Sequence, residues 1–95
     1  AAAIEAARAV SRQLDGCMIR QAQLLGARYG AARSNPDAVN ALLRTAQSSC
    51  RALADSVRET LQKPQTLSMA YTYAFAKAAR QSADDAFLAE LYATK

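Results

Sequence analysis

The sequence predicts an all-α protein, an antiparallel bundle of four helices in a single domain over residues 1–95, with five or three as the alternative helix counts. Apolar side chains recur at spacings of three and four along most of the chain, which is the period of helices that bury one face. Short connections between these segments favour antiparallel neighbours. Alanine supplies 24 of the 95 residues, so we expect a thin core that depends on close approach of the helices.

The first helix is predicted over residues 2–28. One side of its helical wheel carries the expected buried stripe: Ile4, Ala7, Val10, Leu14, Cys17, Met18, Ala22, Leu25 and Tyr29. The opposite side is charged and polar, as expected for a helix with one buried face. Gly16 costs such a helix about 1 kcal/mol, and we expect it to permit the close approach of a neighbouring helix. Gly30 is a candidate C-terminal cap.

A helix boundary is predicted at residues 34–37, Ser34-Asn35-Pro36-Asp37. This stretch supplies a capping side chain, assigned here to Ser34, a proline suited to the first turn and an acid favoured by the helix dipole. The second helix is predicted to run unbroken from there to Pro64. Its expected buried stripe is Val39, Leu42, Leu43, Ala46, Cys50, Leu53, Val57 and Leu61.

The third helix is predicted to begin after Pro64, with Thr66 as its cap, and to run to about Gln81. Its expected buried stripe is Leu67, Ala70, Tyr71, Ala74, Phe75 and Ala78. Ser82 with Asp85 resembles a capping box, which predicts a short fourth helix over residues 83–93. That helix is expected to bury Phe87, Leu88 and Leu91, with Tyr92 as a further candidate. The alternative is one continuous helix that bends near Ser82.

The two cysteines, Cys17 and Cys50, lie at equal distances from the turn predicted at Arg33–Ser34. Folding the chain back at that turn sets them level, so we expect a disulfide between them and a secreted or extracellular location. The alternatives are two buried free thiols and an intermolecular bridge. The chain starts with three alanines and lacks a basic segment followed by a hydrophobic one, so we expect that any signal peptide has been removed or that the chain is a fragment.

The residue types present do not favour catalysis. Histidine, the commonest general base and nitrogen ligand for metals, is absent from the sequence. The cysteine spacing matches neither a redox motif nor a zinc site. Asp84 and Asp85 are adjacent, so on a helix they diverge by about 100°. We therefore expect a protein that is not an enzyme and holds neither a metal nor a cofactor. No apolar run has the length of a membrane span, so none is expected.

Arginine dominates the net charge of +4. The predicted basic surface consists of Arg8, Arg12, Arg20, Arg44, Arg51 and Arg58. Three of them, Arg44, Arg51 and Arg58, are spaced seven residues apart, so we expect them to form a basic ridge on the second helix. Such a surface predicts binding to nucleic acid or anionic surfaces, whereas the simpler interpretation is a solvated helix face.

The aromatic segment of residues 69–75 is the predicted interaction site, with Met69, Tyr71, Tyr73 and Phe75 on more than one helix face. Tyrosine and methionine are enriched at protein interfaces, so self-association or binding of a protein partner is expected there. In the alternative interpretation, Tyr71 and Phe75 fill the core while Tyr73 lies flat on the surface. A third hypothesis is a carrier with a cavity for a small hydrophobic ligand between the helices.

A family resemblance rests on the Ala-, Ser-, Gln- and Arg-rich helices, the segment Ala74-Phe75-Ala76 and the predicted caps at Ser34 and Ser82. In these features the chain resembles the globular helical domains of spider-silk proteins (spidroins). The resemblance implies an extracellular helical bundle that keeps silk protein soluble in storage and helps it to assemble. The two cysteines and the arginine content depart from that family's repeat units, and the resemblance assigns no functional residue.

Together these features predict a non-enzymatic, secreted structural or interaction domain that self-associates. The alternative is a small basic protein that binds nucleic acid or anionic surfaces.

Overall fold

The computed structural model describes residues 2–93, which form four α-helices and one short 3-10 helix and contain no strand. The elements in order are α1 (Ala2–Arg28), η1 (Gly30–Ser34), α2 (Pro36–Ser49), α3 (Arg51–Gln62) and α4 (Met69–Ala93). The helices pack against one another, which confirms the all-α class and the helical bundle. Within residues 2–93, none of the helices combines the length and the apolar character needed to cross a lipid bilayer.

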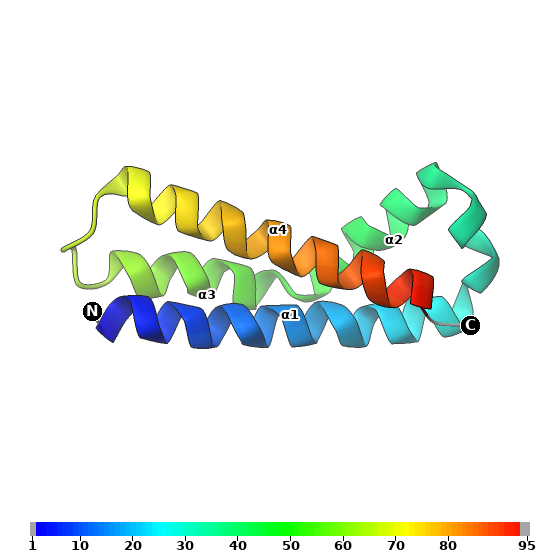
Figure 1. Ribbon diagram of the computed structural model, residues 1–95, viewed down its shortest axis with the longest axis horizontal. Coiled ribbons are helices and arrows are strands. Elements are labelled where there is room, and N and C mark those ends of the chain that lie inside the picture. Colours follow the sequence, from blue (N-terminus) through cyan, green and yellow to red (C-terminus); the bar gives the residue numbers. More distant parts are fainter. Residues whose placement is uncertain (1, 94–95) are drawn as a thin grey trace.

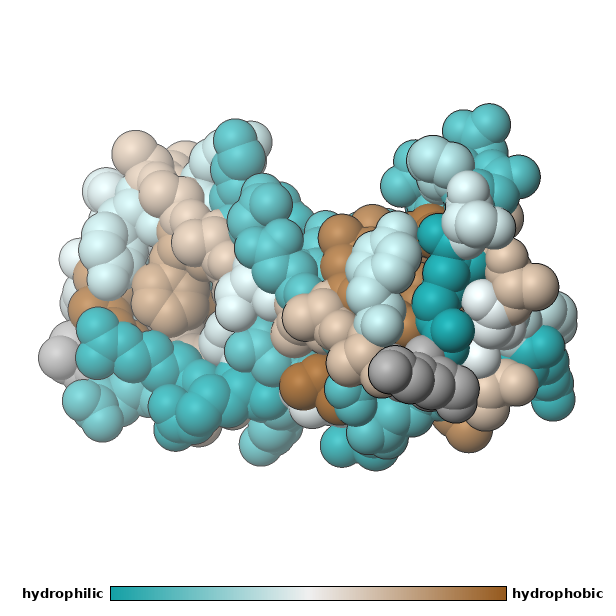
Figure 2. Space-filling view, turned by 45° about the vertical axis from the view of Figure 1, so that its right-hand side comes forward, coloured by the Kyte–Doolittle hydropathy of each residue, from teal (hydrophilic) through white to brown (hydrophobic). Residues whose placement is uncertain are grey.

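The bundle is an elongated body of 47 × 20 × 17 Å built from three rods (Figure 1). α1 spans its whole length, α2 and α3 together form a broken second rod that returns in the opposite direction, and α4 runs back in the direction of α1 (Figure 1). α3 packs along the N-terminal half of α1, whereas α2 points away from it. Figure 2 shows the result, a notch in one face between α2 and the raised N-terminal half of α4, with hydrophobic residues at its base.

The second predicted helix is broken at Cys50, so the prediction of one unbroken helix to Pro64 is wrong. Cys50 has φ −104° and ψ 11°, outside the helical region, and it separates α2 from α3. Its own amide still donates to the carbonyl of Ala46 (3.0 Å), and its carbonyl accepts from Leu53 (3.1 Å), so the break leaves the backbone hydrogen-bonded. No proline or glycine lies at this position, and tertiary contacts therefore decide the bend.

The N-terminal cap of α2 is Asn35 and not Ser34. The Asn35 side-chain oxygen accepts hydrogen bonds from the amides of Asp37 (3.0 Å) and Ala38 (3.3 Å), as an N-cap does. Ser34 ends η1, where its hydroxyl donates to the carbonyl of Ala31 (3.2 Å). Gly30 opens η1 without a positive φ, so it is not the left-handed cap that the sequence suggested.

α4 is one continuous helix of 25 residues, so the prediction of a separate fourth helix is wrong and the continuity of the alternative is confirmed. It begins after Ser68, whose hydroxyl accepts from the amide of Tyr71 (3.0 Å), so Thr66 is not its cap. At Ser82 there is no helix start, and the Ser82 hydroxyl instead donates to the Asp15 carboxylate on α1 (3.3 Å).

The buried stripe of α4 lies about one residue away from the predicted one in its first half. The buried residues are Thr72, Ala76, Ala79, Ala83, Phe87 and Leu91. Ala70, Tyr71, Ala74 and Ala78 are exposed, and Phe75 is half-buried. In a continuous helix, Phe87 and Leu91 determine the buried face, which then extends backwards in steps of three and four to Thr72. Leu88 is half-buried, while Tyr92 is exposed.

The buried residues form two clusters along the rods. The larger cluster contains Leu14, Met18, Ala22, Val39, Ala46, Cys50, Ala83, Phe87 and Leu91. The smaller one contains Ala7, Val57, Leu61 and Ala79, with Phe75 among the side chains packed against it. The stripes predicted for α1 and for the α2–α3 rod are buried or half-buried throughout, except Tyr29, which is 47% exposed just beyond the end of α1.

Candidate interaction site

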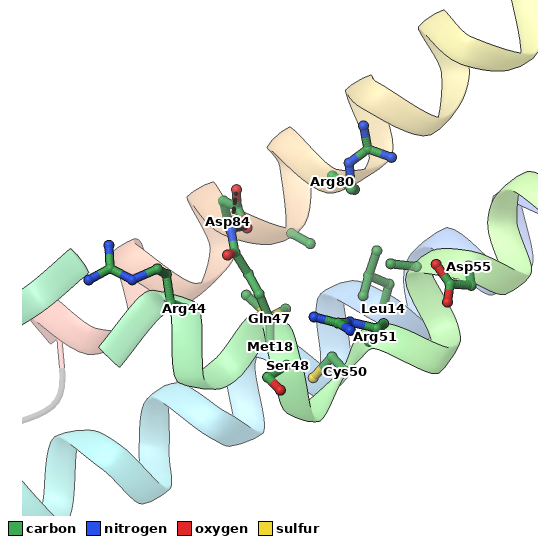
Figure 3. Close-up of a pocket in the computed structure, with 12 residues that line it drawn as sticks. Leu14, Met18, Arg44, Gln47, Ser48, Cys50, Arg51, Asp55, Arg80 and Asp84 are labelled. Carbon is green, nitrogen blue, oxygen red and sulfur yellow. Dashed lines mark hydrogen bonds between the residues drawn. The ribbon is translucent and has the colours of Figure 1, made fainter. Parts of the chain in front are cut away.

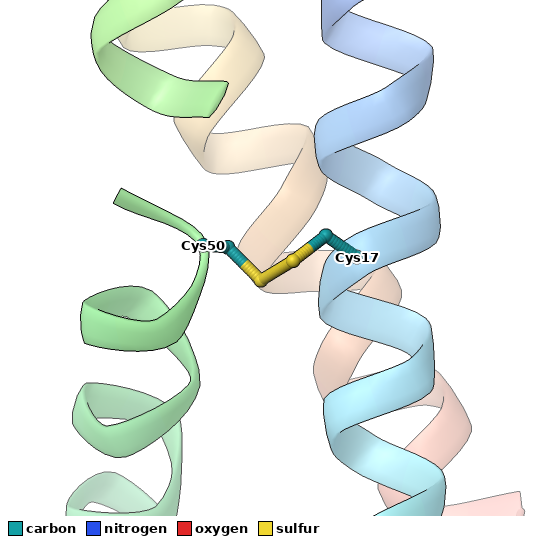
Figure 4. The surroundings of a disulfide bond; sticks show 2 residues. All are labelled: Cys17 and Cys50. Atoms are coloured by element: carbon teal, nitrogen blue, oxygen red, sulfur yellow. A yellow bond between two sulfur atoms is a disulfide. The ribbon is translucent and has the colours of Figure 1, made fainter. Parts of the chain in front are cut away.

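The disulfide between Cys17 and Cys50 joins the middle of α1 to the α2–α3 break, with a Cα–Cα distance of 6.1 Å (Figure 4). This confirms the predicted pairing, and neither cysteine is free. Cys50 is buried and Cys17 is half-buried. The bond holds the break against α1, and α2 leaves from that point at an angle to α3 (Figure 1).

A groove of about 480 Å³ lies between the α2–α3 break and the middle of α4 (Figure 3). Its apolar lining residues are Leu14, Met18, Cys50, Ala54 and Ala83. Its polar and charged lining residues are Arg44, Gln47, Ser48, Arg51, Asp55, Arg80 and Asp84. Because α2 and α3 meet at an angle, the broken rod leaves a space beside α4 at Cys50. This space is the groove.

The two carboxylates of the groove already have partners. Gln47 of α2 donates from Nε2 to both carboxylate oxygens of Asp84 on α4, each at 3.1 Å (Figure 3). Asp55 lies 3.8 Å from the Arg58 guanidinium in a half-exposed ion pair.

The three arginines of the groove are different. Within residues 2–93, Arg44, Arg51 and Arg80 form no ion pair, so their guanidinium groups are available to an incoming anion. Arg51 and Arg44 come from the α2–α3 rod and Arg80 comes from α4, so the charges lie on both walls (Figure 3).

The predicted basic residues are distributed over more than one face. Arg44 and Arg51 line the groove, whereas Arg58 pairs with Asp55. The ridge expected on an unbroken helix does not exist, because the break at Cys50 separates Arg44 from the other two. Arg80 was not among the predicted residues. Nothing in its sequence position distinguishes it, because only the crossing of α4 over the α2–α3 break places it at the groove.

The remaining basic residues, Arg8, Arg12 and Arg20, are exposed on α1. Arg12 and Arg20 line a second hollow of about 650 Å³ together with Gly16 and Leu53. A Cβ placed on Gly16 would meet only the Arg20 guanidinium, at 3.4 Å. The expectation that Gly16 permits close approach of a neighbouring helix is therefore wrong.

The aromatic segment at the start of α4 is largely exposed. The exposed fractions are 85% for Met69, 41% for Tyr71 and 61% for Tyr73. Phe75 is half-buried against the smaller core cluster, with its ring centroid 6.3 Å from that of Tyr71. The alternative in which Tyr71 fills the core is thus wrong. Met69 and Tyr73 are one turn apart on one flank of α4, and Tyr71 and Phe75 occupy the other flank.

Comparison with known proteins identifies no relative: no family model, no curated protein and no solved structure matches the chain. Among the described residues, no group of three or more cysteine, aspartate and glutamate side chains is arranged to hold a metal ion. The candidate sites therefore rest on the geometry of this molecule alone.

Proposed function

We propose that this chain is a non-enzymatic, extracellular interaction domain that self-associates through the N-terminal end of α4. The observation that carries the proposal is the exposure of Met69 and Tyr73, at 85% and 61%, on one flank of a regular helix. Their positions one turn apart present both side chains to the same partner surface. Methionine and tyrosine are residue types enriched at interfaces.

The Cys17–Cys50 disulfide supports the extracellular part of the proposal. Disulfides persist in oxidising compartments and are rare where thiols are kept reduced. The resemblance to silk-protein domains agrees with it, because those are extracellular bundles that assemble, although the two caps at Ser34 and Ser82 no longer count toward that resemblance.

The size of the patch predicts weak association. Burying a methionine or a large apolar side chain gains about 1.5–3 kcal/mol, and association costs at least about 4 kcal/mol in lost freedom of motion. Burial of two side chains from each copy therefore exceeds the cost of association by only a small free energy. Association is therefore expected at high concentration, on the order of 0.1–1 mM.

The test is sedimentation velocity on the oxidised chain over a concentration series, comparing the wild type with Met69→Ser/Tyr73→Ser. The matched control is Leu24→Ser/Tyr92→Ser, which removes two side chains that are 66% and 54% exposed near the C-terminal ends of α1 and α4. The α4 variant is expected to remain monomeric while the control associates like the wild type. A wild type that is monomeric at about 1 mM, or equal loss in both variants, contradicts the proposal.

A second candidate function is binding to polyanions through α1. The observation that favours it is the shared hollow of Arg12 and Arg20, neither of which forms an ion pair within residues 2–93. Retention on heparin that falls steeply with salt is expected. Arg12→Gln/Arg20→Gln should elute at clearly lower salt than Arg44→Gln/Arg51→Gln, which removes the same charge elsewhere. Equal shifts in both variants would rule out a dedicated α1 site.

A further inference from the structure

We infer that the groove between the α2–α3 break and α4 binds an acidic peptide segment of a partner protein. This site is separate from the α4 end proposed for self-association. The inference rests on three arginines without ion pairs around a concave, apolar floor.

The positions of the arginines suit a segment that lies along the groove. Arg44 and Gln47 are one turn apart on α2, and Arg51 is the first residue of α3 after the break. The two cations therefore stand on either side of Gln47 along one wall, as Figure 3 shows. Arg80 stands one turn before Asp84 on the opposite wall. Because the two walls run antiparallel, Arg80 lies toward the Arg51 end of the groove, as Figure 3 shows. Carboxylates spaced along one peptide would meet guanidinium groups from both walls.

The three arginines that line the groove outnumber its two aspartates, and this positive net charge favours an anionic partner. Asp84 is engaged by Gln47 and Asp55 is 3.8 Å from Arg58, so neither carboxylate is paired with the three groove arginines. A guanidinium group binds a carboxylate through two parallel hydrogen bonds, which lysine cannot do. The groove thus offers three such contacts without first breaking an ion pair among the described residues.

The floor distinguishes a peptide from other anions. Leu14, Met18 and Ala83 are only 3%, 1% and 2% exposed, so the floor offers little apolar surface to the alkyl chain of a lipid. Proteins that bind single-stranded nucleic acid combine a positively charged groove with aromatic side chains on which the bases stack, and none of the described residues that line the groove is aromatic. A short peptide needs neither feature, because its carboxylates reach the arginines while small apolar side chains touch the floor.

The experiment uses the oxidised full chain and a blocked, fluorescein-labelled peptide of about 12 residues with glutamates three and four apart. Its partner peptide carries glutamine at every glutamate position. Binding is measured by fluorescence anisotropy at about 20 and 150 mM salt, since the ion pairs are screened as salt rises. The groove variant is Arg44→Gln/Arg51→Gln/Arg80→Gln. The control, Arg8→Gln/Arg28→Gln/Lys63→Gln, removes the same net charge from exposed residues that line neither the groove nor the hollow of Arg12 and Arg20.

The groove variant is expected to bind the glutamate peptide about tenfold more weakly than the wild type, and the control by less than about threefold. The glutamine peptide should bind only weakly to the wild type and to both variants. Equal weakening in both variants, or equal binding of the two peptides, overturns the inference. The inference is also overturned if unlabelled single-stranded DNA displaces the labelled peptide from the groove more strongly than the unlabelled glutamate peptide does.

A charge exchange makes the test independent of the triple variant's folding. Arg80→Glu should lose affinity for the glutamate peptide and gain affinity for a version with lysine in place of glutamate. Far-ultraviolet circular dichroism confirms that each variant is folded. If Arg80→Glu leaves the preference between the two peptides unchanged, Arg80 does not face the bound segment and the groove is not the site.

Discussion

Gln47 on α2 donates a hydrogen bond from Nε2 to each oxygen of the Asp84 carboxylate on α4, at 3.1 Å. This contact joins the two walls of the groove across the point where α2 departs from α3. The contact exists because Cys50 breaks the rod three residues after Gln47 and turns α2 toward α4. Its neighbours Arg44 and Arg51 are thereby placed along the same wall.

We expect the disulfide to stabilise the folded protein mainly by closing a loop of 33 residues in the unfolded chain, which lowers the entropy of that chain. That closure corresponds to about 3–4 kcal/mol in the chain-entropy description. Cys17→Ser/Cys50→Ser should therefore lower the free energy of unfolding by that amount, measured by urea denaturation. A matched comparison is the reduced wild type, which should lose a similar amount. A change under about 1 kcal/mol would show that the unfolded chain is already compact at this loop.

Phe87 is the largest fully buried side chain, with no exposed surface, and it belongs to the larger core cluster. Phe87→Ala should lower the free energy of unfolding by about 3–5 kcal/mol, since it removes apolar contacts and leaves a cavity. Tyr73→Ala removes another aromatic side chain that is 61% exposed, and it should cost well under 1 kcal/mol. Thermal unfolding followed by circular dichroism compares the two. Similar losses would mean that Tyr73 packs against the bundle.

Gln65 has φ 53°, in the left-handed region, within the connection between α3 and α4. A non-glycine residue costs about 1–2 kcal/mol there, whereas glycine adopts this conformation without steric cost but loses more chain entropy on folding. Gln65→Gly should therefore raise the free energy of unfolding by about 0.5 kcal/mol. Gln81→Gly, in the middle of α4, should lower it by about 1 kcal/mol. A destabilising effect at both positions would contradict the left-handed conformation at Gln65.

Asn35 caps α2 and the neighbouring Ser34 does not, so we expect substitutions at the two positions to change the free energy of unfolding by different amounts. Asn35→Ala should lower the free energy of unfolding by about 1 kcal/mol, because its side chain accepts from the amides of Asp37 and Ala38. Ser34→Ala removes only an exposed bond to the Ala31 carbonyl and should cost under about 0.5 kcal/mol. Chemical denaturation of the two variants decides between them. A larger loss at Ser34 would restore the cap that the sequence pattern suggested.

The errors of the sequence-based prediction share one origin. Ser82 has the local sequence pattern of a helix start, yet α4 continues through it. Cys50 has no local pattern of a helix break, yet the rod of α2 and α3 is broken there. Local propensities are about 1 kcal/mol or less per residue, and burial of a large side chain contributes more. Contacts between rods therefore override the local pattern at both positions.

The candidate sites were predictable to different extents. The exposure of Met69 and Tyr73 follows from aromatic and sulfur-bearing side chains on several faces of one helix, a pattern visible in the sequence. The groove was not visible, because Arg44, Arg51 and Arg80 meet only where α4 crosses the broken rod.

By itself, the sequence determined the helical class, the extent of α1, the stripes that the first two rods bury and the pairing of Cys17 with Cys50. These properties follow from a period of three to four residues and from symmetric distances about a turn, both of which are local or one-dimensional. Only the tertiary structure decided the break at Cys50, the face that α4 buries and the groove with its three arginines. Each of these depends on which surfaces of separate helices meet, because burial of apolar area between rods outweighs the preferences of the individual residues.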